Sequence, residues 1–297
     1  MKRGVWIGAA AYTLWGLFPL YWTQIESVPA LQIIAHRIAW SFIVLLALMA
    51  GDRLRRRGTG PGVRLESIRL YAIAALLIGL NWFLYVWGVN HGLVVGTSLG
   101  YFITPLVNVL LGVVVLRERL RPAQWLAVAI AAGGVAYLSV AYGSVPWISL
   151  VLALTFGTYG LVKKKAPLPA ASGLTVETGI LFLPAVAFLA ATELDGTGAF
   201  LHDGVRVTLL LAGAGIVTTI PLLLFATAAQ RVQLSVLGIL QYISPTIQFF
   251  LGVFLYREPF SRSQLIGFGL VWAALAIFAV DGSIAHTRQP VLDEGRF

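Results

Sequence analysis

The segment YFITPLVNVLLGVVVLRERLRPAQ, residues 101–124, is repeated at residues 241–264 as QYISPTIQFFLGVFLYREPFSRSQ. The two segments align without a gap, and eight of their 24 positions are identical. Pro105 matches Pro245, and a glycine, an Arg-Glu pair and a glutamine match in the same register. Shared apolar composition does not readily produce such a register. The alignment therefore predicts an internal repeat that divides the chain into two halves. Matched positions are separated by a constant number of residues, the distance along the chain from residue 101 to residue 241, and we call this separation the repeat offset.

The composition indicates a protein embedded in lipid. Hydrophobic residues make up 59% of the chain and charged residues 11%, with a mean hydropathy of +0.86, whereas a soluble domain has about 25% charged residues. One core cannot bury this much apolar surface. The net charge of +9 is typical of basic cytoplasmic loops in a membrane protein, so we expect no nucleic-acid partner. The chain has no cysteine, which excludes disulfides and thiolate metal sites, and we expect neither a cofactor nor a metal.

Apolar runs of about 17 to 25 residues are candidates for membrane-spanning helices. The sequence contains ten such runs, at residues 4–24, 31–50, 68–90, 93–116, 123–141, 145–162, 173–192, 205–229, 233–255 and 262–281. The basic start of the first run could belong to a signal peptide, but no A-x-A-like site follows it, so we expect a retained helix. Residues 51–67 read as a polar linker and residues 282–297 as a loose cytoplasmic tail.

The repeat places the fourth run on the ninth, so the predicted fold is ten helices arranged as five followed by five. An odd number of helices in each half forces the halves into opposite orientations. We therefore predict an all-α integral membrane protein built from two inverted five-helix repeats, residues 4–141 and 145–281. Inverted repeats are a frequent plan of secondary transporters, in which two halves rock around a shared site.

Basic residues predict the orientation of the helices. With the N-terminus placed inside, seventeen of the 21 Lys and Arg residues fall in inner segments. Arg206, Arg257 and Arg262 fall in outer segments, and Arg37 lies within a span. Cytoplasmic loops are enriched in Lys and Arg, so the bias predicts that both termini lie in the cytoplasm.

Each half contains the pattern P-x6-G-x5-E near its fourth helix, at Pro105, Gly112 and Glu118 and again at Pro245, Gly252 and Glu258. Two five-helix halves with this pattern resemble the EamA domains of the drug/metabolite transporter superfamily. The segments that resemble its RarD-type branch are AAYTLWGLFPLYW, HRIAWSF, NWFLYVWGVN, TSLGYFITPLVNVLLG, YGLVKKKAPLPAASGLTVET and LQYISPTIQFFLGV. The resemblance covers residues 4 to about 281 and implies a ten-helix carrier of the bacterial inner membrane. RarD-type proteins are named for chloramphenicol sensitivity, which implies one candidate substrate class.

Arg37 is the charge that the second span has to accommodate. It lies about 9 Å into the span. One interpretation is that it extends outward to the membrane surface or bonds to a neighbouring helix. The other is that it faces a central cavity, where it binds an anionic group or holds a gate. The adjacent His36 points about 100° away and would titrate near neutral pH only if water reached it. Glu177, in the repeat equivalent of this helix, is the approximate acidic counterpart on the inner side. The alternative for Glu177 is a residue at the membrane interface that caps the seventh helix or pairs with Lys163–Lys165.

Several other residues within the spans are candidates for solute binding or gating. Pro105 and Pro245 each free a backbone carbonyl four residues back, which suits a kink beside a cavity. The neutral polar candidates are Asn81, Asn108, Gln241 and Gln248, for which interhelical hydrogen bonding is the alternative role. The candidates for an aromatic cavity wall are Trp15, Trp82, Tyr85, Tyr101 and Tyr242. Such a wall would suit an apolar, aromatic or cationic solute.

These features predict a secondary transporter of a small organic metabolite or drug, acting by alternating access and driven by a gradient, in the direction of efflux. Its expected partners are the solute, the lipid bilayer and protons or another coupling ion. The sequence has no G-x4-G-K-[ST] loop for ATP. The alternatives are a membrane-embedded enzyme or a channel that uses the polar residues of the second and seventh helices. An enzyme needs clustered acids, bases or metal ligands, and a channel needs a filter or a charge ring.

Overall fold

A computed structural model describes residues 2–56, 65–91, 93–141, 147–257 and 261–287, and within these ranges it is helical with no strand. In chain order the elements are α1 (Lys2–Gly16), α2 (Phe18–Trp22), the 3-10 turn η1 (Thr23–Ile25), α3 (Ala30–Arg56), α4 (Leu65–Asn90), α5 (Val94–Val114), α6 (Pro122–Ala141), α7 (Trp147–Lys165), α8 (Ala170–Leu194), α9 (Val205–Arg231), α10 (Leu234–Gln241), α11 (Ile243–Phe250), the π-helical turn η2 (Leu251–Leu255) and α12 (Arg262–Thr287). Among the described residues, eight helical segments are long and apolar enough to cross a membrane. The prediction of an all-α membrane protein is confirmed.

The first predicted span is interrupted. α1 ends at Gly16 and α2 begins at Phe18, with Pro19 in the first turn of α2. Proline has no N–H, so Pro19 leaves the carbonyl of Trp15 without its helical donor. The side-chain Nε2 of Gln248 donates to this carbonyl at 3.3 Å. Gln248, a residue of the second half, thereby supplies the hydrogen bond that the carbonyl of Trp15 lacks at the helix break in the first half.

The two repeated prolines have different effects on their helices. α5 continues through Pro105, whereas the equivalent segment is divided at Tyr242 into α10 and α11, three residues before Pro245. The break lies next to Gln241. The carbonyl of Gln241 has no helical donor because Pro245, four residues later, lacks an N–H. The helix is therefore divided near the repeated proline in the second half, at Tyr242, but not in the first half.

Helix positions recur at the repeat offset. α3, α4, α5 and α6 begin at residues 30, 65, 94 and 122, and α8, α9, α10 and α12 begin at residues 170, 205, 234 and 262. The separation within each pair equals that between residues 101 and 241 of the repeated sequence. Arg117 and Arg257 also share a positive φ, of 56° and 54°. After them, Gln124 and Gln264 each accept a hydrogen bond from a backbone N–H three residues earlier, at 2.9 and 2.7 Å.

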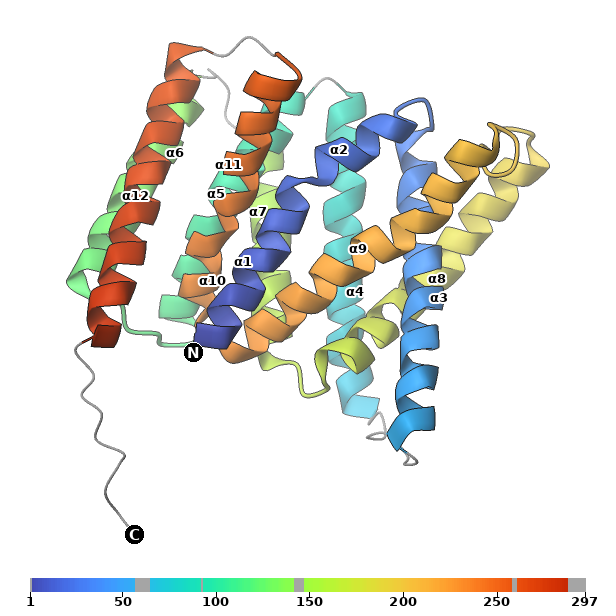
Figure 1. Cartoon of the computed structure of the whole chain (residues 1–297), viewed down its shortest axis with the longest axis horizontal. Coiled ribbons are helices and arrows are strands. Elements are labelled where there is room, and N and C mark those ends of the chain that lie inside the picture. Colours follow the sequence, from blue (N-terminus) through green and yellow to red (C-terminus); the bar gives the residue numbers. More distant parts are fainter. Residues whose placement is uncertain (1, 57–64, 92, 142–146, 258–260, 288–297) are drawn as a thin grey trace.

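The helices form one bundle in which elements of the two halves alternate. α3 packs against α8 and α9, α5 against α7 and α10, and α6 against α12. In Figure 1, α6 and α12 form one edge, α3 and α8 lie toward the other, and α12 ends at the end of the bundle where α1 begins. Glycine allows the closest approaches: a Cβ on Gly238 of α10 would lie 2.7 Å from the carbonyl oxygen of Pro105, and one on Gly215 would lie 2.5 Å from the backbone of Trp40.

Three predicted boundaries differ from the structure because polar ends continue as helix beyond the apolar runs. α3 extends to Arg56 and α4 begins at Leu65, so much of the predicted linker is helical. α12 extends to Thr287, into the predicted tail. The rest of that tail, residues 288–297, lies outside the described residues, as does Glu258 of the repeated motif.

Candidate functional site

A cavity of about 370 Å³ lies between helices of both halves. Its lining extends from Trp22 of α2 and Ala30 of α3 down to Tyr12 in α1 and Ile78 in α4. The residues on its wall that the sequence had singled out are Trp15, Arg37, Asn81, Trp82, Tyr85, Tyr101, Gln241, Pro245 and Gln248. The cavity thus brings together predicted site residues from α1, α3, α4, α5, α10 and α11.

Arg37 faces this cavity. Its Nε donates a hydrogen bond to Oγ1 of Thr218 at 3.0 Å. Its guanidinium lies over the rings of Trp82 and Trp22, at 4.6 and 4.9 Å from their centroids, and 5.9 Å from that of Phe18. Cation–π contacts of this kind are strongest where water is excluded. Arg37 is therefore held in place by aromatic faces and one hydroxyl, with no carboxylate partner among the described residues.

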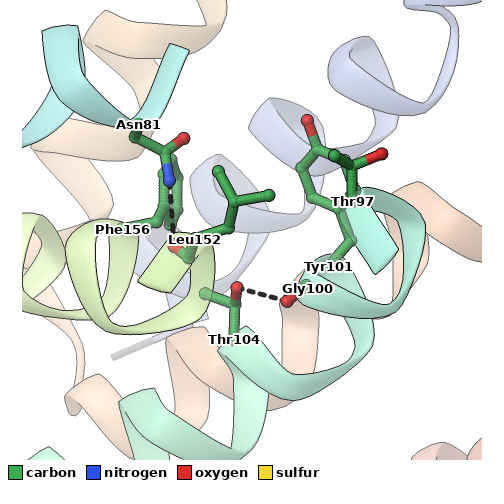
Figure 2. Close-up of a pocket in the computed structure, with 7 residues that line it drawn as sticks. All are labelled: Asn81, Thr97, Gly100, Tyr101, Thr104, Leu152 and Phe156. Atoms are coloured by element: carbon green, nitrogen blue, oxygen red, sulfur yellow. Dashed lines mark hydrogen bonds between the residues drawn. The ribbon is translucent and has the colours of Figure 1, made fainter. Parts of the chain in front are cut away.

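Amide side chains on the cavity wall also join helices. Asn81 donates to the carbonyl of Leu152 at 2.9 Å and to Oγ1 of Thr155 at 2.8 Å, which ties α4 to α7. Figure 2 shows this contact beside a small recess of about 10 Å³ next to Tyr101. Gln241 accepts a hydrogen bond at 3.0 Å from Nδ2 of the fully buried Asn108. The structure thus uses Asn81 as an interhelical link and leaves Asn108 behind the wall rather than on it.

Three further candidates are not among the residues that line the large cavity. His36 is buried, and its ring lies 5.0 Å from that of Phe200. Tyr242 is also buried, and its hydroxyl donates to the carbonyl of Phe102 at 3.1 Å. Pro105 lies in the packed contact with Gly238. These positions are structural contacts within the bundle.

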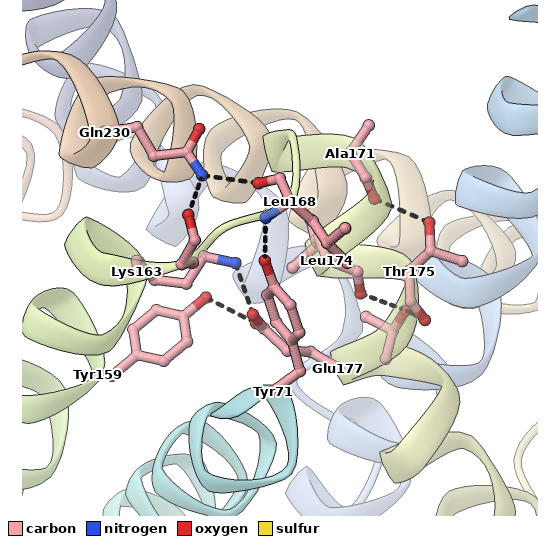
Figure 3. A network of polar contacts seen from close by, with 11 residues as sticks. Tyr71, Tyr159, Lys163, Leu168, Ala171, Leu174, Thr175, Glu177 and Gln230 are labelled. Atoms are coloured by element: carbon pink, nitrogen blue, oxygen red, sulfur yellow. Dashed lines mark hydrogen bonds and ion pairs between the residues drawn. The ribbon is translucent and has the colours of Figure 1, made fainter. Parts of the chain in front are cut away.

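Glu177 lies in a buried polar network with residues near the ends of α7 and α9 (Figure 3). These two helices end at the end of the bundle where α1 begins (Figure 1). Its carboxylate accepts hydrogen bonds from Nζ of Lys163 at 2.6 Å and from the hydroxyl of Tyr159 at 3.2 Å. The side chains of Lys163 and Glu177 are 1% and 2% exposed. Two buried charges are tolerated because each neutralises the other. The pair with Lys163 is the alternative that the sequence analysis had left open.

The network extends to the loop between α7 and α8. The hydroxyl of Tyr71 accepts a hydrogen bond from the backbone N–H of Leu168 at 2.9 Å. Nε2 of Gln230 donates to the carbonyl of Leu168 at 2.9 Å. Helices α4, α7, α8 and α9 and this loop are therefore fastened together around the ion pair.

Arg37 and Glu177 do not share a cavity. Glu177 lines a separate small cavity of about 10 Å³. Ile78, Trp82 and Leu222 line both this small cavity and the large one. We call these three residues the barrier, since they lie between the two spaces.

Sequence reasoning missed several residues of the site. Phe18 and Trp22 were not among the predicted site residues because the first span was read as one helix, although Pro19 was a signal of a break. Nothing in the sequence of their own helix, α9, indicated that Thr218 and Leu222 belong to the site. Leu222 nevertheless lies at the repeat offset from Trp82, so the repeat could have pointed to the barrier.

Comparison with known proteins assigns the fold and the family. Residues 2–140 and 144–280 each match the EamA-like transporter family. Protein RarD of Streptomyces exfoliatus is 46% identical over 284 residues, covering 94% of this chain and 89% of that protein. The uncharacterized transporter YojE of Bacillus subtilis is 45% identical, with 93% of each chain covered, and protein RarD of Escherichia coli is 42% identical, with 97% covered. A solved crystal structure aligns with a TM-score of 0.69 at 19% identity over 94% of this chain and 98% of the other, which is a likeness of fold. The chain is a membrane transporter that belongs to the EamA-like transporter family, in its RarD branch.

Proposed function

We propose that the protein is a secondary transporter that exports a small organic solute across the bacterial inner membrane by alternating access. The observation that carries this proposal is the pair of unequal cavities on either side of the barrier. A carrier needs one site that is reached from one side of the membrane at a time. The large cavity at Arg37 is the open side, and the small cavity at Glu177 is the closed one.

The repeat offset supports a pseudo-symmetric origin of the two cavities. Arg37 and Ile34 line the large cavity, and Glu177 and Leu174, their equivalents in the second half, line the small one. Trp82 and Leu222 are a further pair at this offset, and both belong to the barrier. We propose that the small cavity is the collapsed counterpart of the large one. During transport the large cavity then closes as the small cavity opens, and the reverse step restores the first state.

The proposed topology has ten spans in two inverted five-helix repeats. The eight membrane-length segments are joined by α7 and by the interrupted α1 and α2. The equal spacing of α3 to α6 and of α8 to α12 supports the division into halves. α3 starts at the end of the bundle marked by α2, whereas α8 starts at the opposite end (Figure 1), as inversion requires.

We propose that both termini lie in the cytoplasm. Lys163–Lys165 lie at the end of the bundle where α1 begins, and Arg117, Arg119 and Arg121 lie between α5 and α6. Clustered basic residues on one side support a cytoplasmic assignment of that side. The large cavity then faces outward, and the network around Glu177 closes the inner side.

In this mechanism the Lys163–Glu177 pair is the inner closure. Opening the inner side requires the pair to separate and the barrier to part, while the aromatic residues around Arg37 close the outer side. An ion or solute gradient supplies the free energy, and a proton is the candidate coupling ion because Glu177 is a carboxylate that loses its partner on opening.

The absence of cysteine from the sequence makes a single-cysteine accessibility experiment the sharpest test. Ile33→Cys reports on the large cavity and Leu174→Cys on the small one. We expect a membrane-impermeant maleimide added outside to label position 33. The same reagent added inside should label position 174 only after a transported solute shifts the equilibrium from the outward-open to the inward-open state, and position 33 should then be protected.

The outcomes separate the candidate functions. Simultaneous labelling of both positions from their own sides would indicate a channel. Labelling that solute never changes, at any concentration that saturates binding, would contradict alternating access. A cysteine at exposed Leu194, away from both cavities, is the control and should label identically in every condition.

A further inference from the structure

The charge of the large cavity selects one kind of solute. Arg37 is the one charged side chain among the described residues that line it, and no Asp or Glu from that part of the chain contributes to the wall. A guanidinium has five N–H donors, and the structure assigns one of them, Nε, to Thr218. The remaining donors are available to an acceptor on a solute.

The aromatic rings nearest the charge are already occupied. Trp22 and Trp82 lie on Arg37 itself, at 4.9 and 4.6 Å. A cationic solute would have to displace Arg37 from these rings and would meet a like charge with no carboxylate to offset it. The rings instead fix the guanidinium in position, so less entropy is lost when it binds a planar anion.

The rest of the wall suits an apolar body. Trp15 and Tyr85 contribute aromatic surface, and Ser244 and Gln248 contribute neutral polar groups on the α11 side. The volume of about 370 Å³ is within the range of small-molecule sites, about 300–1,000 Å³. A solute with one charged end and a ring-sized apolar end fits this distribution.

We propose that the large cavity binds a monovalent organic acid whose carboxylate pairs with the free N–H groups of Arg37 and whose apolar body lies along the aromatic wall. That the bound acid is the transported solute rests on the proposed transport function. That the cavity binds a carboxylate rests on the geometry of Arg37. A carboxylate matches the fork of a guanidinium with two parallel hydrogen bonds.

The test compares an acid with its uncharged analogue. Calorimetric titration of the purified full-length protein with 3-phenylpropionate and with 3-phenylpropionamide separates charge from shape. We expect the acid to bind at least tenfold more tightly than the amide. Arg37→Gln should remove this preference by weakening the acid alone, and Arg37→Lys should retain part of it. Arg206→Gln is the matched control, because Arg206 is an exposed arginine bonded to Gln24 outside the cavity.

Several results would overturn the proposal. These are equal affinities of wild-type protein for acid and amide, an undiminished preference in Arg37→Gln, or no binding across a series of monocarboxylates from acetate to indole-3-propionate. If the Arg37 variants do not fold, the wild-type comparison of acid with amide decides alone.

Flux measurements in proteoliposomes distinguish a failure of the proposed anion site from a failure of the proposed transport function. Flux of neutral solutes without any preference for acids would overturn the anion site and leave the transporter intact. Tight acid binding without flux of any acid in either direction would leave the anion site intact and count against the proposed transport of its ligand.

Discussion

Arg37 and Glu177 are each the eighth residue of their helix, α3 and α8, and so occupy equivalent positions of the repeat. Arg37 faces the large cavity, whereas Glu177 is buried against Lys163 at 2.6 Å. Equivalent positions thus have opposite charges and opposite degrees of enclosure. Under the proposed inversion, the difference between these two positions is the difference between the open and the closed side of the transporter.

Removing one member of the Lys163–Glu177 pair should destabilise the protein strongly. Glu177→Met or Lys163→Met leaves the other charge buried and unpaired, which costs about 3–5 kcal/mol in buried pairs of soluble proteins. We expect a clear fall in the unfolding temperature of the purified protein in detergent, measured by intrinsic fluorescence. The double variant Lys163→Met with Glu177→Met should recover much of the loss.

The double variant provides the control for that experiment. Losses that simply add in the double variant would contradict a direct pairing, because a coupled pair gives a non-additive cycle. Glu193→Gln is a second control: Glu193 pairs with His202 at 2.9 Å, but both side chains are exposed. An exposed pair contributes little to stability, so this variant should unfold at nearly the wild-type temperature.

The barrier should be sensitive to loss of volume at Leu222. This side chain is 2% exposed and lines both cavities, so Leu222→Ala should connect them. We expect the inner reporter cysteine at position 174 to become reactive toward reagent added from outside, while the Lys163–Glu177 pair keeps the inner side closed.

Leu211→Ala is the matched control for the barrier. Leu211 is 0% exposed on the same helix, but it packs with Ile25 and Val28 away from both cavities. Both substitutions should cost about 2–5 kcal/mol of stability, and only Leu222→Ala should change accessibility. Equal accessibility in the two variants would show that the barrier does not separate the cavities.

Much of the fold was predictable because it depends on patterns that the sequence states directly. Long apolar runs predict the helices, and the internal repeat predicts the spacing that α3 to α6 share with α8 to α12. The break at Pro19 was missed because the apolar run continues through it without change in hydropathy. The local rule for proline, rather than the length of the run, governs that position.

The site was less predictable than the fold because side-chain partners depend on how helices rotate and pack. Arg37 was singled out as a charge inside a span, and it lies in a membrane-length segment of α3 and lines the large cavity. Asn81 and Gln248 looked equivalent to each other as polar residues, yet Asn81 binds the backbone of α7 and Gln248 binds the broken turn at Trp15. Nothing in the sequence near Asn81 indicates that Leu152 lies opposite. Such contacts are determined by tertiary packing alone.

The close contact of α5 with α10 should depend on Gly238. A Cβ there would lie 2.7 Å from the carbonyl oxygen of Pro105 and 2.9 Å from the Cβ of Asn108, and neither can move without shifting α5. Gly238→Ala should therefore cost about 1–3 kcal/mol through overpacking. Gly269→Ala is the matched control in α12, where a Cβ meets nothing within 4 Å. It should be neutral or stabilising, because alanine favours helix by about 1 kcal/mol over glycine.

The start of α10 should depend on Glu118, which the sequence analysis had treated as part of a repeated motif. Its Oε1 accepts from the backbone N–H of Leu234 at 2.7 Å, and its Oε2 accepts from the N–H and the hydroxyl of Ser235 at 2.9 and 2.7 Å. A carboxylate that satisfies the first N–H groups of a helix acts as its cap, and a lost cap costs about 0.5–2 kcal/mol. Glu118→Ala should lower the unfolding temperature accordingly, and Ser235→Ala, which keeps both backbone contacts, should lower it less. A larger effect from Ser235→Ala would contradict capping by Glu118 and assign the stabilisation to the hydroxyl instead.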